Sequence, residues 1–281
     1  MKPRPPTFRR MVNLLVSILG GASAVLGILA LAWILWEVAA RGLGAFNWAF
    51  FTQLPAPPGV SGGGLANAII GTLVMTLLAT MLAVPLGLLG GVFLSEYGQE
   101  SRLADNVRFA TNVLMGVPSI IIGIFIYIIL VLPRGNFSGY AGAAALAVIM
   151  LPVVVRTAED MLRLVPNTLR EAALALGAPR WKVTLAVLFR AAKSGLITGI
   201  LLAVARVSGE TAPLLFTALN SSYWMHSLGE PTPNLTVTIF NYAMSPYPDW
   251  QQMAWGASLL ITFGVLALTV IARISFKGRH L

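Results

Sequence analysis

The chain has 281 residues, of which 57% are hydrophobic and only 10% are charged. Its mean hydropathy is +0.80, whereas about a quarter of the residues of an ordinary soluble chain are charged. This composition excludes a soluble globular protein and predicts an integral membrane protein. The net charge of +9 does not indicate nucleic-acid binding, because the basic residues lie between apolar runs, as the positive-inside rule expects.

Neither metal nor disulfide chemistry is expected. The chain has no cysteine, and its two histidines, His226 and His280, lie far apart in sequence. Disulfides and thiolate ligands are therefore excluded, and the histidines form no ligand cluster. We expect no metal and no cofactor bound by this chain.

Six apolar runs are long enough to cross a bilayer, which takes about 20 helical residues. The sequence therefore predicts an all-α protein with six transmembrane helices. A signal peptide is the alternative for the first run, but a signal h-region has only about 7–15 apolar residues, so we expect a retained helix. The runs are Val12–Glu37, Ala66–Leu94, Ala110–Leu132, Tyr140–Val155, Ser194–Leu219 and Gln252–Arg273.

Lysine and arginine positions predict the orientation. With the N-terminus placed in the cytoplasm, two basic residues, Arg41 and Arg134, lie in outer segments and sixteen lie in inner segments. The positive-inside rule then predicts that both termini are cytoplasmic. The inner residues are Lys2, Arg4, Arg9, Arg10, Arg102, Arg108, Arg156, Arg163, Arg170, Arg180, Lys182, Arg190, Lys193, Arg273, Lys277 and Arg279.

The inner segment 156–193 is the longest hydrophilic stretch and has a helical pattern. Gly177 and Pro179 predict the end of one helix, and a second helical run begins near Trp181 and merges into the fifth apolar run. Two short helices meeting at a bend can enter a groove on a partner; the alternative is an interfacial helix lying on the lipid surface. The apolar residues at three- and four-residue steps are Leu162, Val165, Leu169, Ala172, Ala173 and Leu176.

Arg206 and Glu210 stand within the fifth apolar run. At a spacing of four they are expected on one face of a helix, where each charge costs about 2.5–3.5 kcal/mol at the bilayer centre. One interpretation is a paired couple that fixes subunit packing. The other is an anion path, because a guanidinium binds phosphate or carboxylate oxygens in pairs and a nearby carboxylate keeps binding weak enough for release. Glu210 could also accept a proton from a protonated oxyanion, which sulfate does not offer.

Two proline-containing sites predict irregular helices. Pro213 follows Glu210 and can break the fifth helix, and the segment Gly116–Ser119 predicts a bend in the third, with freed carbonyls facing protein or a cavity. Thr72, Thr76 and Thr80 share one face of the second run, where threonines usually bond back within the helix or to neighbouring helices.

The two longest outer segments, Arg41–Leu65 and Asn220–Gln251, are rich in proline, glycine, tryptophan and tyrosine. Aromatic residues at this level commonly anchor a protein among lipid headgroups. A docking surface for a soluble partner is the alternative, and the sequence leaves both open.

Catalytic motifs are missing. The chain contains no G-x-x-x-x-G-K-[ST] loop and no H-E-x-x-H motif. We expect a non-catalytic subunit that does not hydrolyse nucleotide. Energy for uphill transport must come from a partner or from an ion gradient.

The segment carrying Glu171, Ala172, Ala173 and Gly177 resembles the EAA loop of type I (MetI-like) ABC importer permeases. In that family the loop forms coupling helices seated in a groove of the cytoplasmic ATPase. The family usually continues with Ile-x-Leu-Pro, whereas the segment Val187–Arg190 has no proline.

Three further stretches resemble the A-subunit permeases of phosphate-specific ABC importers: Gly116–Phe125, Ala205–Ala218 and Thr238–Pro246. The resemblance implies a permease subunit for inorganic phosphate import across a bacterial inner membrane. The implied organisation is an N-terminal tail, first helix and outer segment (1–65), a type I transmembrane domain (66–273) and a cytoplasmic tail (274–281). The residues it links to substrate passage are Ser119, Arg206, Glu210 and Thr211.

The same resemblance implies a complex. Its members are a related permease (PstC-like) as heterodimer partner, two cytoplasmic ATPase subunits (PstB-like) that bind the ATP, and a periplasmic phosphate-binding protein (PstS-like) that meets the outer segment Asn220–Asp249. The alternatives are a permease for sulfate or molybdate and an ion-gradient-driven secondary transporter with Glu210 as its proton site. A membrane-embedded enzyme is a third, and it lacks a catalytic constellation.

Overall fold

The computed structural model describes residues 6–98 and 101–275. Over these residues the chain is mostly helical, and the only strand-like pairing within them is an isolated bridge between Pro55 and Gly63. Lys2, Arg4, Lys277 and Arg279 and most of the expected C-terminal tail lie outside the described residues, as does the side chain of Arg273. The prediction of an all-α protein is confirmed.

Five straight helical stretches in the described residues have the length and hydropathy to cross a membrane, and a bent helix pair brings the total to six if it counts as one span. The expected first, second and sixth helices are confirmed, with longer ends. The straight stretches are Phe8–Ala45, Ala66–Tyr97, Gly139–Arg163, Arg180–Ser208 and Pro248–Ile271. The bent pair is Arg102–Gly116 with Ser119–Arg134.

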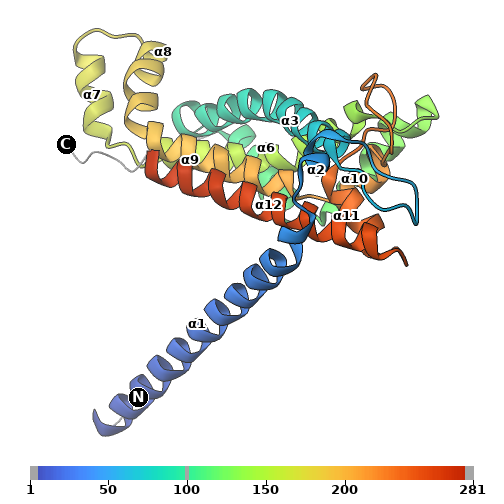
Figure 1. Cartoon of the computed structure of the whole chain (residues 1–281). Helices are drawn as coiled ribbons and strands as arrows, with labels where there is room; N and C mark the ends of the chain where they lie inside the picture. The colour runs from blue at the N-terminus through green and yellow to red at the C-terminus, as the bar shows by residue number, and fades with distance from the viewer. Residues whose placement is uncertain (1–5, 99–100, 276–281) are drawn as a thin grey trace.

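The elements follow one another along the chain as Figure 1 colours them. The first half comprises α1 (Pro6–Gly42), η1 (Leu43–Ala45), α2 (Trp48–Thr52), α3 (Ala66–Val92), η2 (Phe93–Tyr97), α4 (Arg102–Gly116), α5 (Ser119–Ile126), η3 (Tyr127–Val131) and η4 (Leu132–Arg134). The second half comprises α6 (Gly139–Arg163), α7 (Asn167–Ala175), α8 (Arg180–Val183), η5 (Thr184–Leu188), α9 (Phe189–Ser208), α10 (Ala212–Thr217), α11 (Leu235–Ala243) and α12 (Pro248–Ser275).

The centre of the bundle is the pair α3 and α6. Gly87 and Gly91 of α3 lie against α6 so closely that a Cβ on Gly91 would stand 2.3 Å from the Cβ of Ala158. Small residues permit such close backbone approach between membrane helices. The buried residues around this seam include Met75, Ala79, Ala83, Leu146, Met150 and Val154.

Helix α1 projects away from the rest of the bundle (Figure 1). None of its most apolar 18-residue window is buried within the chain. Its C-terminal end packs on α12, where a Cβ on Gly42 would lie 2.7 Å from the Cβ of Leu259 and 2.8 Å from the carbonyl oxygen of Trp255. The bundle is therefore built from α3 to α12.

The third predicted span, Ala110–Leu132, is divided by its bend into two helices and begins earlier, with α4 at Arg102. α4 and α5 meet at an angle of 104°, with Val117 in an extended conformation (φ −71°, ψ 129°). Pro118 causes the break, because proline disfavours helical geometry in the residue before it and has no N–H to donate. The bend predicted at Gly116–Ser119 is confirmed.

The fourth and fifth predicted spans also need correction. The fourth, Tyr140–Val155, continues as α6 to Arg163, because the charged residues of its last two turns pair with one another and with α4. The fifth, Ser194–Leu219, does not run through: α9 ends at Ser208, and α10 is a separate helix.

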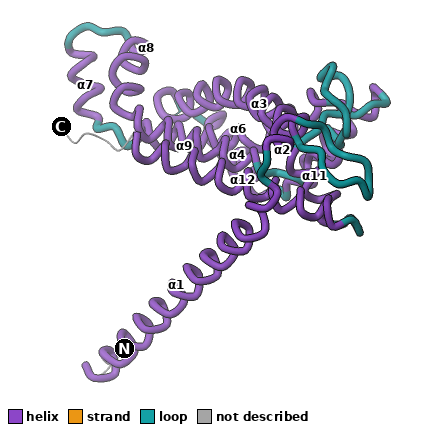
Figure 2. Tube along the Cα trace, viewed as in Figure 1, coloured by secondary structure: helices purple, strands orange, loops and turns teal. Residues whose placement is uncertain are grey.

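The loops gather at two opposite ends of the helical body (Figure 2). The segment 164–188 with α7 and α8 stands at one end, and the segments around α2 and α11 stand at the other. We call segment 164–188 the coupling loop, because it carries the residues that resemble the EAA loop. This separation agrees with loops on opposite sides of a membrane.

Candidate functional site

Arg206 and Glu210 flank the end of α9. The helix stops at Ser208, so the expectation that both residues share one helix face is wrong: Arg206 is in the last turn and Glu210 lies beyond it. The Arg206 Nε and Glu210 Oε1 atoms are 4.0 Å apart, and the side chains are 56% and 17% exposed. The pair is loose, and the guanidinium is open to a ligand.

A buried polar cluster holds this break in place. The Thr236 hydroxyl donates to the Glu210 carbonyl oxygen at 3.0 Å. Asn234 caps α11 by accepting from the Val237 N–H at 2.9 Å and donates to the Leu219 carbonyl at 2.9 Å. Leu219 adopts a positive φ of 57°. Sequence analysis missed this cluster, although Asn234 before an apolar run with threonines is a recognisable N-cap signal.

Thr72 ties the cluster to the bundle. Its hydroxyl accepts from the Leu235 N–H at 2.8 Å and donates back to the Ala68 carbonyl at 2.8 Å. Thr80 bonds back to the Thr76 carbonyl at 2.7 Å, so the predicted back-bonding is confirmed for these two. The buried Thr76 hydroxyl has no hydrogen-bond partner among the described residues.

The short helices that follow the two breaks, α5 and α10, pack against each other. Gly123 of α5 packs on α10 so closely that a Cβ on it would stand 2.6 Å from the Pro213 Cα. Ser119 is four residues earlier and lies on the same side of α5. The backbone carbonyl of Thr211 accepts hydrogen bonds from the N–H groups of Leu214 and Leu215 in α10. Both side chains are half-buried, and within the described residues neither is hydrogen-bonded to Arg206 or Glu210.

This geometry suits transient binding of an oxyanion. A planar guanidinium offers paired donors to phosphate-type oxygens, and its carboxylate neighbour is close enough to weaken but not to block such binding. Broken membrane helices with side chains at the breaks are a recurring way to place a substrate within a bundle. No group of three potential metal ligands occurs in the part of the chain that the structure describes.

The coupling loop has the predicted two-helix shape. α7 ends in a left-handed turn at Gly177 (φ 79°), closed by the Ala178 N–H to the Ala173 carbonyl and the Gly177 N–H to the Leu174 carbonyl. This is a Schellman motif. Glu171 and Ala172 are exposed with Gly177, whereas Ala173 is half-buried. The exposed apolar side chains are Leu169, Leu174, Leu176 and Trp181.

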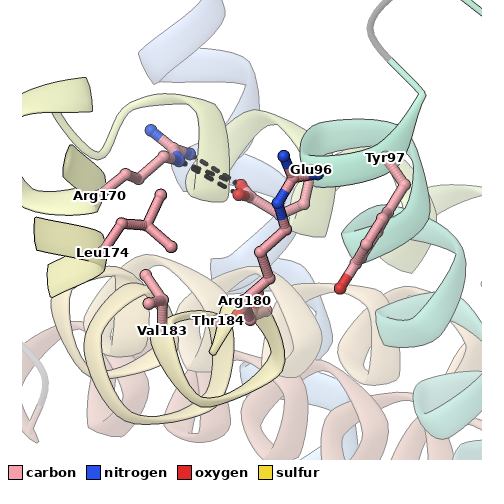
Figure 3. Close-up of a pocket in the computed structure, with 7 residues that line it drawn as sticks. All are labelled: Glu96, Tyr97, Arg170, Leu174, Arg180, Val183 and Thr184. Carbon is pink, nitrogen blue, oxygen red and sulfur yellow. Dashed lines mark hydrogen bonds and ion pairs between the residues drawn. The ribbon is translucent and has the colours of Figure 1, made fainter. Parts of the chain in front are cut away.

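Arg170 fastens this loop to α3 and α6 (Figure 3). Its Nη2 atom is 2.9 Å from Glu96 Oε1 at the end of η2. It also donates to the Leu162 carbonyl at 2.7 Å and the Val165 carbonyl at 2.6 Å. Both charged side chains are mostly buried, at 16% and 15% exposed. They line a cavity of about 390 Å³ together with Arg180.

A second buried ion network lies nearby. Glu159 of α6 is 1% exposed and receives Arg108 of α4 at 2.7 Å and Arg163 at 2.9 Å. Arg108 also donates to the Leu94 carbonyl at 2.8 Å. Sequence analysis missed both networks, because the partners stand 51 and 74 positions apart.

The outer segments are joined by Trp250. Its indole N–H donates to the Ala56 carbonyl at 3.2 Å, and its ring stacks on Tyr242 at 4.3 Å. Burial raises the pKa of Tyr242 to about 12. Trp48 and Tyr223 are exposed, at 83% and 75%, and either expected role, headgroup anchoring or docking, is compatible with them.

The fold and the coupling loop define a class of membrane transport component. Residues 83–278 match the family described as binding-protein-dependent transport system inner membrane component. A chain of the inward-facing MetNI methionine ABC transporter superposes with a TM-score of 0.64, covering 76% of this chain and 94% of its own. At 21% identity this likeness shows the fold, and it confirms a type I, MetI-like transmembrane domain.

The relatives of the chain narrow the family assignment further. The phosphate transport system permease protein PstA of Yersinia pestis is 47% identical over 97% of this chain and 93% of its own length. PstA 1 of Mycobacterium tuberculosis (strain CDC 1551 / Oshkosh) is 38% identical over 96% and 90%. The chain therefore belongs to the PstA family of permeases. It is a multi-pass, non-catalytic membrane subunit of an ABC importer, and a separate ATPase and other subunits complete the transporter.

Proposed function

We propose that this chain is the subunit through which an ATP-driven importer carries inorganic phosphate across the bacterial inner membrane. The observation that carries the proposal is the open guanidinium of Arg206, 4.0 Å from its carboxylate and 56% exposed at a helix break. The names of the relatives, phosphate transport system permeases, agree with an oxyanion as the substrate.

Arg206 holds the anion in this proposal, and Glu210 prevents tight binding. A hydrogen bond to a charged group contributes about 1.5–3 kcal/mol. This is enough for phosphate to bind at Arg206 in place of water, but not so tightly that it cannot leave. Ser119 and Thr211, at the two breaks, supply hydroxyl donors. Glu210 accepts a hydrogen bond from the P–OH group of the monohydrogen or dihydrogen anion, a donor that sulfate does not offer at neutral pH.

The coupling loop receives motion from the ATPase. Glu171, Ala172, Ala173 and Gly177 form the docking edge, and the exposed leucines and Trp181 enter a groove on that partner. Arg170 passes movement of α7 to α3 through Glu96 and to α6 through the carbonyls of its last turn. This arrangement favours partner docking over a helix that rests on lipid.

The organisation of the complex follows the same proposal. Residues 66–273 form the transmembrane domain, residues 1–65 a peripheral helix with its outer segment, and residues 274–281 a tail, with both termini in the cytoplasm. The partners are a PstC-like permease in a heterodimer, two PstB-like ATPase subunits that bind ATP, and a PstS-like binding protein at the outer segment. This chain needs no cofactor of its own.

Phosphate uptake into vesicles reconstituted with the whole complex tests the proposal. Arg206→Gln should abolish ATP-dependent uptake and keep ATPase binding, whereas Glu171→Lys should lose both. Arg134→Gln, which removes an exposed cation from η4, is the matched control and should transport normally. Uptake that survives ATP depletion while the membrane potential is maintained would instead support a secondary transporter.

Competition by other anions tests which oxyanion the transporter selects. Sulfate and molybdate should not compete with phosphate in the wild type, and Glu210→Gln should weaken that discrimination. A variant that leaves both transport and the choice between phosphate and sulfate unchanged would remove Glu210 from the mechanism.

A further inference from the structure

A groove of about 520 Å³ runs between the end of α3 and the junction of η5 with α9. Its lining is apolar, with Leu88 on one side and Leu185, Ala186 and Ile200 on the other, except for Arg190 and Lys193. The groove is distinct from the break that carries Arg206. It belongs to the end of α9 next to the coupling loop.

The two cations are unsatisfied. Arg190 and Lys193 are exposed, and neither forms a hydrogen bond or ion pair with any of the residues that the structure describes. By contrast, Arg108, Arg163 and Arg170 of the same end are each paired with a carboxylate. The free cations therefore have charge available for a ligand from outside the chain.

The groove is complementary to an amphiphilic molecule, with charge at one end and apolar surface at the other. Arg190, Lys193, Ile197 and Ile200 succeed one another at steps of three and four, so they share one face of α9. From Lys193 to Ile200 the face extends by about 10 Å at 1.5 Å per residue. Positive charge thus stands at the loop end, and apolar surface continues toward the middle of the membrane span.

The groove does not face the proposed phosphate site. At about 100° per residue, Lys193 lies roughly 140° around α9 from Arg206. A second groove, of about 340 Å³ between α3, α9 and α12, has only apolar and hydroxyl side chains in its lining. It offers room for hydrocarbon but no partner for an anionic headgroup, so the two grooves form an internal contrast.

We infer that the groove at Leu88, Ala186, Arg190 and Lys193 binds an anionic phospholipid. Its phosphate and glycerol headgroup pairs with Arg190 and Lys193, and one acyl chain lies along Ile197 and Ile200. Basic pockets between membrane helices on the cytoplasmic side commonly bind such headgroups. The bound lipid lies next to η5, the segment that connects α8 to α9.

Native mass spectrometry of the assembled transporter tests this inference, after solubilisation from bilayers of equal phosphatidylglycerol and phosphatidylcholine with the same acyl chains. The wild type should retain phosphatidylglycerol preferentially. Arg190→Gln and Lys193→Gln should each lower that retention roughly fivefold. Arg102→Gln, which removes an exposed cation from α4, should leave retention unchanged.

A filling variant separates the groove from general surface charge. Ala186→Trp occupies the apolar part without changing charge, and it should displace the lipid. The inference is overturned if the two lipids are retained equally, if Arg102→Gln matches Arg190→Gln, or if Ala186→Trp has no effect. A partner subunit covering the groove would produce the first of these results. Because lipid retention does not depend on the transported anion, this outcome is independent of the phosphate proposal.

Discussion

The buried ion networks near the coupling loop and the ion pair at the helix break are bonded in opposite ways. At the coupling end, Glu159 is 1% exposed and receives two arginines within 3 Å, and Arg170 is paired with Glu96 and two carbonyls. At the helix break, Arg206 is 56% exposed and 4.0 Å from its single partner. Buried ions with several close partners hold helices together, whereas Arg206 keeps its donors for a substrate.

The comparison predicts that variants of these ions differ most in the stability of the fold. Glu159→Ala should have the largest effect, because the mostly buried Arg108 loses its buried carboxylate and retains the exposed Asp105, and Arg163 loses the same carboxylate. We expect a loss of about 3–5 kcal/mol, measured as thermal unfolding of the assembled complex in detergent. Asp160→Asn is the matched control, since that side chain is 45% exposed and its loss should change little.

Variants of the ion pair between Glu96 and Arg170 should have the second-largest effect. Glu96→Gln and Arg170→Gln should each lower transport and raise the ATP hydrolysed per phosphate moved, since α7 is no longer fastened to α3. In a double-mutant cycle on unfolding free energy we expect a coupling of about 0.5–3 kcal/mol. Additive single effects would show that the pair neither stabilises nor transmits.

Gly177→Ala should have a smaller effect. The left-handed conformation at φ 79° costs a residue with a Cβ about 1–2 kcal/mol, and no atom stands within 4 Å of that Cβ. Backbone strain is therefore the only expected cost of the substitution. It should be measured as weaker retention of the ATPase through purification. Gly27→Ala, in α1 with equally open space, should be tolerated; equal losses in both variants would contradict the turn's role.

Arg206→Gln should change stability least, within about 0.5 kcal/mol as for an exposed substitution, and yet abolish phosphate uptake. Arg206→Lys keeps the charge but loses the paired donors, so uptake should be partly retained. Unfolding measurements beside vesicle uptake check both. A destabilisation comparable to that of Glu159→Ala would place Arg206 among the structural ions.

Local signals predicted much of this molecule. Apolar runs located the six spans, Pro118 predicted the bend, and Gly177 predicted the end of α7, because each depends on a few neighbouring residues. The extent of α6 was missed because the charges of its last turns are neutralised by Arg108, 51 positions earlier. The break after Ser208 was placed too late, because Thr236 and Asn234 hold it from another helix. Long-range pairing of this kind leaves no periodic trace in the chain.

The most direct test is a structure of the assembled transporter trapped during transport with phosphate present. The account predicts an anion within hydrogen-bonding distance of the Arg206 guanidinium, near the breaks that carry Ser119 and Thr211. An Arg206 side chain closed against Glu210 at a lipid-facing or dry subunit seam, with phosphate bound elsewhere, would contradict it.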